Sequence, residues 1–288
     1  MASPPQLWPN AARAAISITM DNMGEAADLH RGLWPTDQPV GDHFSVKKSL
    51  PKMLDLLAEK NITATYFIES WNCDVYPDAI KTVAEKGHEV GWHAFQHEVW
   101  SQLDADAEKD NFARSFANAE KVPVVYKGFR PPGGQINPQT LALMKERGLT
   151  YLSPAAERAA VVEDVAIVPF RWREIDAYFY LPSCSVLRTA RGDPESPMPE
   201  SLVQERLCAA VDEAVAKGGY ASFLFHPFLT DSEERLAVMR TVVEYVREKE
   251  GRGEVWCAPC GEVAEWMLGR KGEFGGDPGW DNAQWKKK

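Results

Sequence analysis

The chain alternates short apolar runs of β-type composition with amphipathic stretches of helical period, and this alternation constrains its fold most. The β-type runs lie at 14–20, 62–68, 88–93, 126–130, 149–153, 165–170, 221–226 and 253–258. Between most of them lie helical periods at 45–60, 77–87, 137–148, 201–219 and 234–250. Strands that are apolar nearly throughout are buried on both faces, and strands that alternate with helices pair in parallel. The pattern predicts one α/β barrel-like domain.

The domain organisation follows from the lack of any internal boundary. No composition break, repeat or low-complexity linker divides the 288 residues, and barrels of parallel strands reach this length undivided. We expect an extension over 1–13, the barrel domain over 14–268 and an irregular tail over 269–288. The tail is rich in glycine, and its residues Trp280 and Trp285 indicate that part of it docks.

Composition excludes several classes of partner. The 32 basic and 42 acidic residues give a formal net charge of −10, and no basic stripe offsets it, so we expect no nucleic-acid partner. No stretch approaches the ~18 apolar residues of a membrane helix, and we expect no membrane contact. The first twenty residues carry no positive cluster followed by an apolar run. We therefore expect a cytoplasmic protein, while export of an unprocessed form stays open.

The five cysteines indicate reduced thiols, because an odd number does not suit a disulfide framework. Cys257 and Cys260 form a CxxC motif. A structural zinc site would need a second pair at similar spacing, and the chain has none. We interpret the motif as two thiols at a strand-to-helix turn, one of them buried, without assigning it a role.

Polar residues follow the expected strands at the positions where barrel enzymes carry their chemistry, the carboxyl ends of the strands. Each residue alone has an ordinary explanation: Asp21 could cap a helix, Arg130 could anchor a turn, and one HxxxH pair is a weak metal signal. Their joint occurrence at strand ends predicts a functional site. The residues are Asp21, His93, His97, Arg130, Asp176 and His226.

These residues lie in five ordered motifs that resemble the polysaccharide deacetylase family with the NodB homology domain, carbohydrate esterase family 4. The motifs are "ISITMDNMGEA", "GHEVGWHAFQH", "FRPPGG", "FRWREIDAY" and "FLFHP". They match the family's "TFDD", "GHExxxHxxxH", "RxPxG", Trp-wall and "LxH" segments, in that order. The resemblance implies a distorted (β/α)7-8 barrel and a metal-dependent hydrolase that removes N-acetyl groups from amino sugars.

The resemblance also implies roles for individual residues. His93 and His97 correspond to metal ligands of a divalent ion, with zinc favoured and cobalt or nickel left open. Asp21 corresponds to the catalytic base and His226 to the catalytic acid. Two further residues support this pair: Arg130 corresponds to the residue that holds Asp21, and Asp176 to the partner of that arginine. Four more correspond to residues that flank the substrate: Trp172, Leu224, Trp92 and Pro132.

Two departures from the family pattern affect the expected chemistry. Asn22 stands where the family has an aspartate that ligates the metal, and a neutral amide binds a divalent ion more weakly than a carboxylate does. Either Glu25, three residues further on, or Asp21 itself could complete the ligand set instead. Pro227 follows the catalytic histidine where many members have aspartate. This "HP" form resembles the branch that includes peptidoglycan deacetylase-like proteins, allantoinases and cyclic-imide hydrolases.

Three hypotheses follow. The first is a metal-dependent hydrolase that removes the N-acetyl group of an amino sugar or polysaccharide of chitin or peptidoglycan type. The second is a hydrolase of cyclic ureides or imides on the same scaffold, with weak or no metal dependence. The third is a catalytically silent relative that binds a carbohydrate through Trp92, Trp100 and Trp172. In each case the partner is a small molecule or oligosaccharide, and homo-oligomerisation stays open.

Overall fold

The computed structural model describes residues 7–283, and its centre is one nine-stranded sheet. The strands are β1 (Ala14–Asp21), β2 (Thr65–Ile68), β3 (Glu89–Trp92), β4 (Gly128–Phe129), β5 (Tyr151–Leu152), β6 (Ala160–Val162), β7 (Val165–Ile167), β8 (Tyr220–Phe225) and β9 (Val255–Cys257). Their order is β6-β7-β5-β4-β3-β2-β1-β8, and β9 pairs with β1. Every pairing is parallel except that of β6 with β7.

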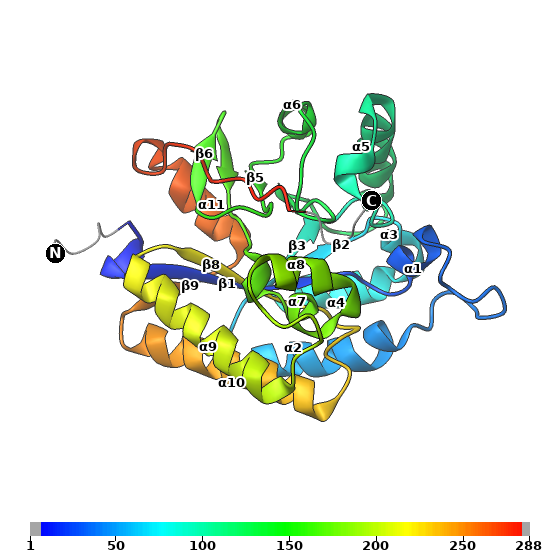
Figure 1. The fold of residues 1–288 in the computed structure, drawn as a ribbon. Coiled ribbons are helices and arrows are strands. Elements are labelled where there is room, and N and C mark those ends of the chain that lie inside the picture. The colour runs from blue at the N-terminus through cyan, green and yellow to red at the C-terminus, as the bar shows by residue number, and fades with distance from the viewer. Residues whose placement is uncertain (1–6, 284–288) are drawn as a thin grey trace.

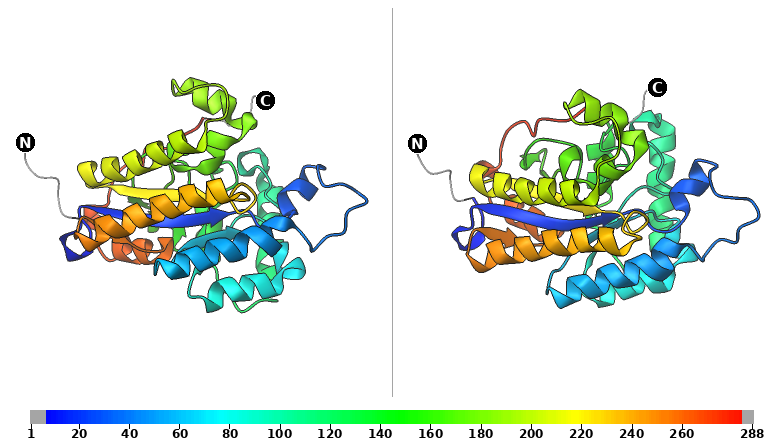
Figure 2. Two further views of the ribbon diagram at one scale, coloured as in Figure 1. Left: turned by 90° about the horizontal axis from the view of Figure 1, so that it is seen from below. Right: turned by 60° about the horizontal axis from the view of Figure 1, so that its bottom comes forward.

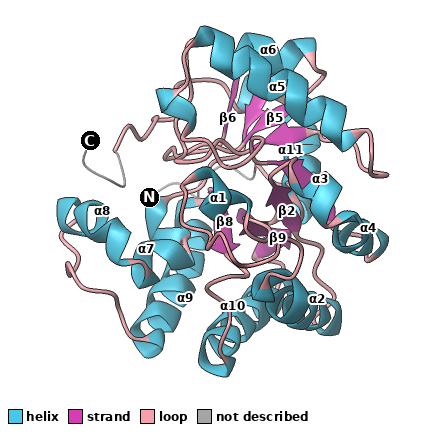
Figure 3. Cartoon of the chain, turned by 90° about the vertical axis from the view of Figure 1, so that its right-hand side faces the viewer, coloured by secondary structure: helices cyan, strands magenta, loops and turns pink. Residues whose placement is uncertain are grey.

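Helices surround this sheet on its outside (Figure 3). They are α1 (Ala26–His30), α2 (Leu50–Glu59), α3 (Asn72–Val75), α4 (Pro77–Glu85), α5 (Ala105–Ala119), α6 (Thr140–Glu146), α7 (Asp176–Tyr180), α8 (Ser185–Ala190), α9 (Glu200–Lys217), α10 (Glu233–Gly251) and α11 (Cys260–Leu268). The two longest, α9 and α10, pack against each other along β8 and β9 (Figures 1 and 2). The resemblance predicted a distorted (β/α)7-8 barrel, and this prediction is confirmed.

The barrel is distorted in two ways: β1 pairs with three other strands, and the sheet is open between β7 and β8. The start of β1 pairs with β9 and its end pairs with β2, while β8 runs along most of its length. All eight residues of β1 are buried, as a strand at the centre of such a sheet requires. No ladder joins β7 to β8; instead a single parallel bridge between Ile175 and Leu224 crosses the seam among the described residues.

Several elements were not expected from the sequence. The strand β6 forms an antiparallel hairpin with β7, and its two-residue turn places Glu163 and Asp164 at φ 48 and 67. The helix α5 also lacked a clear signal, because its sequence is mostly polar. Its start is fixed by the Asp104 carboxylate, which accepts hydrogen bonds from the backbone N–H groups of Asp106 and Ala107.

The core contains the aromatic residues that frame the histidine motif. Trp92 and Trp100 are fully buried and lie edge to face, with ring centroids 5.4 Å apart. Trp92 also stacks on Phe129 and contacts Phe112. These side chains fill the space between β3, β4 and α5, so their function is packing.

The described parts of both terminal segments pack on the barrel. Trp8 is buried and donates its indole N–H to the carbonyl of Gly218. Phe274 of the tail is buried against Trp8, with ring centroids 5.2 Å apart, and Trp280 forms a bridge with Ala156. Trp285 lies outside the described residues. Within 7–283, no helix combines the length and apolar character needed to span a membrane.

Candidate active site

The carboxyl ends of five strands deliver polar side chains to one edge of the sheet. Parallel strands end at the same edge, so residues that are distant in sequence meet there. Asp21 is the last residue of β1, and Glu69, His93, Arg130 and His226 each follow the end of a strand. All five are buried, with exposed fractions of 7% or less. The sequence predicted this convergence for every one of them except Glu69.

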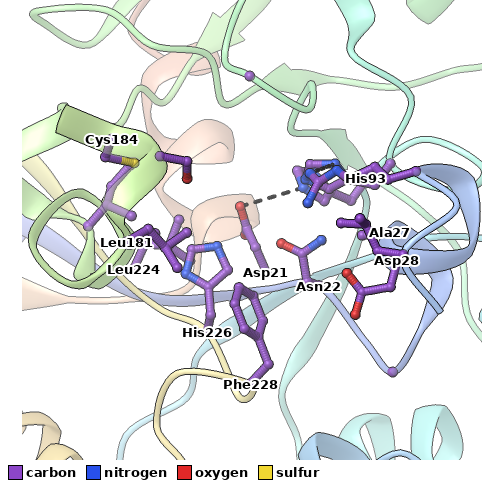
Figure 4. A pocket seen from close by; sticks show the side chains of 18 of the residues that line it. Asp21, Asn22, Ala27, Asp28, His93, Leu181, Cys184, Leu224, His226 and Phe228 are labelled. Carbon is purple, nitrogen blue, oxygen red and sulfur yellow. Dashed lines mark hydrogen bonds and ion pairs between the residues drawn. The ribbon is translucent and has the colours of Figure 1, made fainter. Parts of the chain in front are cut away.

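Asp21 is held in a fixed orientation by Arg130. The Arg130 Nη1 atom donates to Asp21 Oδ1 at 2.8 Å, and its other N–H groups donate to the hydroxyls of Thr19, Ser153 and Ser222. A guanidinium with this many donors engaged cannot rotate away. The second carboxylate oxygen, Oδ2, is left facing His93 Nε2 at 3.8 Å (Figure 4).

One ring nitrogen of His93, Nε2, points toward Asp21. Its Nδ1 donates to the backbone carbonyl of Arg130 at 2.6 Å, which leaves Nε2 as the unprotonated nitrogen of the neutral ring. Burial lowers the pKa of His93 to about 4, and it lowers the pKa of His97 well below the ordinary value. Both rings are therefore neutral at neutral pH, the state in which imidazole ligates a metal.

His97 lies beside His93, with ring centroids 4.9 Å apart. The two histidines belong to a turn and not to a helix, although their spacing is also that of one helical turn. Arg31 Nη2 donates to His97 Nδ1 at 3.0 Å. Ala94 and His97 have φ values of 65 and 67, and Asn22 across the site has φ 61. Left-handed backbone at non-glycine residues is costly and clusters at functional sites.

The third member of the histidine group is Glu69. Among the described residues, Glu69, His93 and His97 form the one set of His, Cys, Asp or Glu side chains with ligand atoms all within 4.8 Å of one another. Burial raises the pKa of Glu69 to about 8. Its Oε1 accepts from Asn22 Nδ2 at 2.7 Å, and its Oε2 accepts from the backbone N–H of Met23 at 2.9 Å.

This arrangement changes the expected roles of Asn22 and Glu25. The Asn22 amide donates to the Glu69 carboxylate, so a carboxylate from the next strand lies beside the histidines, where the family pattern has one at position 22. Glu25, the expected alternative ligand, does not reach the histidines. It is fully buried and accepts hydrogen bonds from the Tyr76 hydroxyl at 2.5 Å and from the Gly41 N–H at 2.6 Å.

Asp176 contacts His226 and does not contact Arg130, which corrects the expected pairing. Asp176 Oδ1 lies 2.5 Å from His226 Nδ1, and Oδ2 accepts the backbone N–H of His226 at 2.7 Å. Burial alone would lower the pKa of His226, but the Asp176 carboxylate outweighs it and the net shift is upward. His226 thus has the carboxylate partner that a protonated imidazole needs.

A cavity of about 450 Å³ opens onto these groups. Asp21, Asn22, His93, His97 and His226 line its polar side. Trp172 and Leu224, expected to bind substrate, also line it. Trp92 and Pro132, expected in the same role, do not: Trp92 belongs to the aromatic core, and the neighbours Pro131 and Gly133 line the cavity in place of Pro132.

The cysteines of the CxxC motif lie apart from this site. Burial raises the pKa of Cys257 to about 12 and also raises that of Cys260. Cys260 is fully buried, and both thiols are free. Thiols with raised pKa values are unreactive at neutral pH, so the motif contributes to packing at the start of α11.

Comparison with known proteins identifies the family that this fold and site resemble. The sequence profile described as Polysaccharide deacetylase matches residues 37–152. A peptidoglycan-N-acetylglucosamine deacetylase of Bacillus cereus is 32% identical over 102 residues, which are 34% of this chain and 46% of that protein. The chain spans about a third to a half of the length of the curated relatives that it matches first.

Solved structures extend the likeness to most of the chain. A Mycobacterium smegmatis protein assigned to the polysaccharide deacetylases superposes with a TM-score of 0.78 at 23% identity, covering 98% of both chains. The allantoinase PuuE superposes with a TM-score of 0.74 at 19% identity, covering 93% of this chain and 95% of its own. At these identities the superpositions show the fold. Together with the profile match, they confirm the resemblance to the polysaccharide deacetylase family.

One residue of the candidate metal group, Glu69, was not predicted from the sequence. Glu69 directly follows the apolar run "ITATYFI", the same strand-end position that identified Asp21. Its position at the end of a strand could have identified it. Asn22 and Glu25 were predicted as metal ligands instead, because they lie within the motif that resembles the family.

Proposed function

We propose that the protein hydrolyses an amide C–N bond with the help of a divalent metal ion, and that its substrates are N-acylated amino sugars such as the N-acetyl compounds. The observation that carries this proposal is the position of Asp21 between two different groups. Figure 4 shows its carboxylate between His93 on one side and His226 on the other. Amide hydrolysis needs a base for water and an acid for the leaving amine on opposite sides of the reacting carbon.

The Glu69, His93 and His97 side chains fit a divalent ion. Two imidazoles and one carboxylate are a ligand set of catalytic zinc sites, which keep a further position for water or substrate. Zinc is the ion that we favour, and cobalt or nickel would suit the same donors. A bound ion would polarise the substrate carbonyl and lower the pKa of a water molecule.

The proton transfers are assigned to this chain's own residues. Asp21 accepts the proton of the attacking water through Oδ2, the oxygen that Arg130 leaves unengaged. His226 donates a proton to the departing nitrogen, because an amine leaves poorly as an anion. Asp176 keeps His226 protonated by raising its pKa. Leu224 and Trp172 border the substrate from the cavity wall.

A second candidate function, hydrolysis of cyclic ureides or imides, is favoured by the likeness to the allantoinase PuuE, which extends over nearly the whole chain. The same acid and base would open a cyclic amide. The third hypothesis, a silent carbohydrate binder, loses support because Trp92 and Trp100 are buried in the core.

The experiment is a substrate panel run on protein whose metal content is known. Protein purified without added metal is measured by elemental analysis, depleted with a chelator, and reconstituted with zinc. It is then offered glucosamine oligomers carrying N-acetyl groups, allantoin and succinimide. We expect zinc-dependent release of acetate from the sugars; hydrolysis of allantoin or succinimide alone would favour the second function.

A further inference from the structure

One side of the cavity is apolar over a larger area than an acetyl group uses. Six of its lining residues lie in the segment 172–184 or on the end of β8 beside it, and we call them the apolar wall: Trp172, Ile175, Ala177, Leu181, Cys184 and Leu224. In Figure 4 Leu181, Cys184 and Leu224 lie on the His226 side of Asp21, away from His93. The wall is therefore next to the acid, while the metal ligands occupy the other side.

The wall is built by the segment that fills the seam between β7 and β8. A 3-10 turn over Trp172–Glu174, the helix α7 and a second 3-10 turn over Pro182–Cys184 carry Trp172, Ala177 and Cys184. Ile175 and Leu181 lie at the junctions between these elements. The bridge between Ile175 and Leu224 joins this segment to the end of β8. The sixth residue, Leu224, stands two positions before His226 on that strand.

Buried hydrogen bonds fix the segment in place. The fully buried Arg188 donates to the carbonyls of Tyr178, Leu181 and Pro194, at 2.5, 2.9 and 3.0 Å. The Asp193 carboxylate accepts from Tyr178 and from Arg173. A wall held in this way is formed before a ligand arrives, so a matching group loses little entropy on binding.

The chemistry of the wall selects against hydroxyls. A sugar hydroxyl buried without a hydrogen-bond partner is destabilised, because it gives up its hydrogen bonds to water. Five of the six wall side chains offer no strong donor or acceptor. The Trp172 indole N–H is the exception, but it is buried and has no partner among residues 7–283. The wall thus suits an apolar group.

The size of the cavity points in the same direction. At about 450 Å³ it lies in the range of roughly 300–1,000 Å³ that encloses whole small-molecule ligands. One acetyl methyl would touch Leu224 and leave most of the wall bare. We infer that the natural substrate carries an apolar group larger than methyl directly beside the scissile amide, as its acyl chain or as the substituent of its amine. This inference rests on the proposed amide hydrolysis.

The test uses two homologous series with zinc-reconstituted protein. In the first, glucosamine carries N-acyl chains from acetyl to hexanoyl; in the second, acetamide carries N-alkyl groups from methyl to hexyl. Burying one methylene group is worth about a fourfold gain in kcat/KM. We expect such a rise over the first few methylenes in one series, and that series identifies which side of the amide faces the wall.

Two variants should move this chain-length preference in opposite directions. Ala177→Leu fills part of the wall and should reduce the ratio of kcat/KM for the hexanoyl or hexyl substrate to that for the shortest one. Leu181→Ala enlarges the wall and should raise the same ratio. Ala237→Leu, on the exposed face of α10, is the matched control and should leave the ratio unchanged. Because the readout is a ratio within each protein, a general loss of activity does not affect it.

Failure of the inference and failure of the proposed function give different results. If acetyl and methyl compounds are hydrolysed but kcat/KM is flat or falls with chain length in both series, the inference is overturned. If no amide is hydrolysed, yet calorimetry shows affinity for N-alkyl acetamides rising with chain length and falling in Ala177→Leu, the wall is as inferred and the proposed function is wrong.

Discussion

At the scale of single residues, the roles proposed for Asp176 and His226 predict how the reaction depends on pH. His226 acts as an acid only while protonated, and Asp176 raises its pKa above the ordinary histidine value. The basic limb of the kcat profile should therefore lie above about pH 6.5. Asp176→Asn removes the largest upward contribution to the His226 pKa while burial still lowers it, so the limb should move to lower pH and kcat should fall by about 10²-fold.

The measurement is the pH dependence of kcat for both proteins on one substrate. Asp212→Asn is the matched control, because Asp212 lies on the surface and contacts Tyr245 and Lys249. An unchanged basic limb in Asp176→Asn would show that His226 is not the group whose titration limits turnover. The pair also contributes to stability below the ordinary histidine pKa, and this contribution is lost as pH rises through the raised pKa of His226.

Glu69 is the residue whose substitution separates the possible ligand sets. Glu69→Gln removes the carboxylate of the candidate metal group and should weaken zinc affinity by about tenfold or more, as changes at metal ligands and at the residues that hold them usually do. Glu25→Gln makes the same chemical change at a carboxylate bonded to Tyr76 and Gly41, and should leave the affinity as it is. Competition with a zinc chelator measures both. The reverse order of effects would assign the ligand to Glu25.

Arg31 should oppose metal binding. A guanidinium has only donors, so its contact with His97 Nδ1 requires that nitrogen to be the acceptor, and the neutral ring then carries its proton on Nε2. A ligating imidazole instead binds the metal through one nitrogen and keeps the proton on the other. The contact and ligation by His97 exclude each other.

We therefore expect Arg31→Met to tighten zinc binding by about tenfold. Arg31→Lys, which keeps a positive charge and donors, should gain less. Chelator competition at one pH gives both values. Equal or weaker affinity in Arg31→Met would mean that the arginine supports the metal-bound state.

Sequence reasoning placed most of the site because strand ends in a parallel barrel converge whatever lies between them. It could not assign Asp176, because the motif gives its position but not whether its carboxylate turns toward Arg130 or His226. Trp92 shows another limit: aromatic residues beside a functional histidine look the same in sequence whether they line a groove or fill the core.

At the scale of elements, the segment 31–44 lines part of the cavity, and hydrogen bonds of Tyr76 hold its C-terminal end in place. It carries Arg31, Leu33, His43 and Phe44 into the cavity lining. The Tyr76 hydroxyl donates to Glu25 and accepts the backbone N–H of His43 at 2.9 Å. Tyr76→Phe leaves both buried partners unsatisfied, at a cost of about 1–3 kcal/mol.

Hydrogen exchange should then speed up in 31–44 while the strands keep their protection, and thermal unfolding should report the lost stability. Tyr245→Phe removes a hydroxyl from an exposed contact with Asp212 and serves as the control. Uniform loss of protection across the barrel would show that Tyr76 supports the whole fold and not this segment.

Secondary structure was predictable where burial gives the apolar residues a regular spacing along the sequence. The eight predicted strands all form, because continuous apolar runs between helical periods have few other solutions. The β6 strand was missed because its turn residues, Glu163 and Asp164, are not the asparagine and glycine that usually mark left-handed turns. The helix α7 was missed because its sequence, "DAYFY", has no polar face: all of its residues are buried.

At the scale of the whole molecule, the open seam of the barrel is what makes room for the cavity. Where β7 and β8 do not pair, the segment 172–184 inserts and supplies the cavity wall, while the paired strands supply the reacting groups. In the function that we propose, the paired strands hold the polar residues that react, and the segment 172–184 at the seam determines which substrates fit.

The central claim, metal-dependent amide hydrolysis at Asp21, Glu69, His93, His97 and His226, is tested most directly by one titration. Chelated protein is titrated with zinc while amine release from an N-acylated glucosamine is followed. We predict activity that rises from a negligible level and saturates at about one ion per chain, with neither zinc binding nor activity in His97→Ala. Full activity in the chelated protein, or stoichiometric zinc binding without hydrolysis of any amide, would contradict the account.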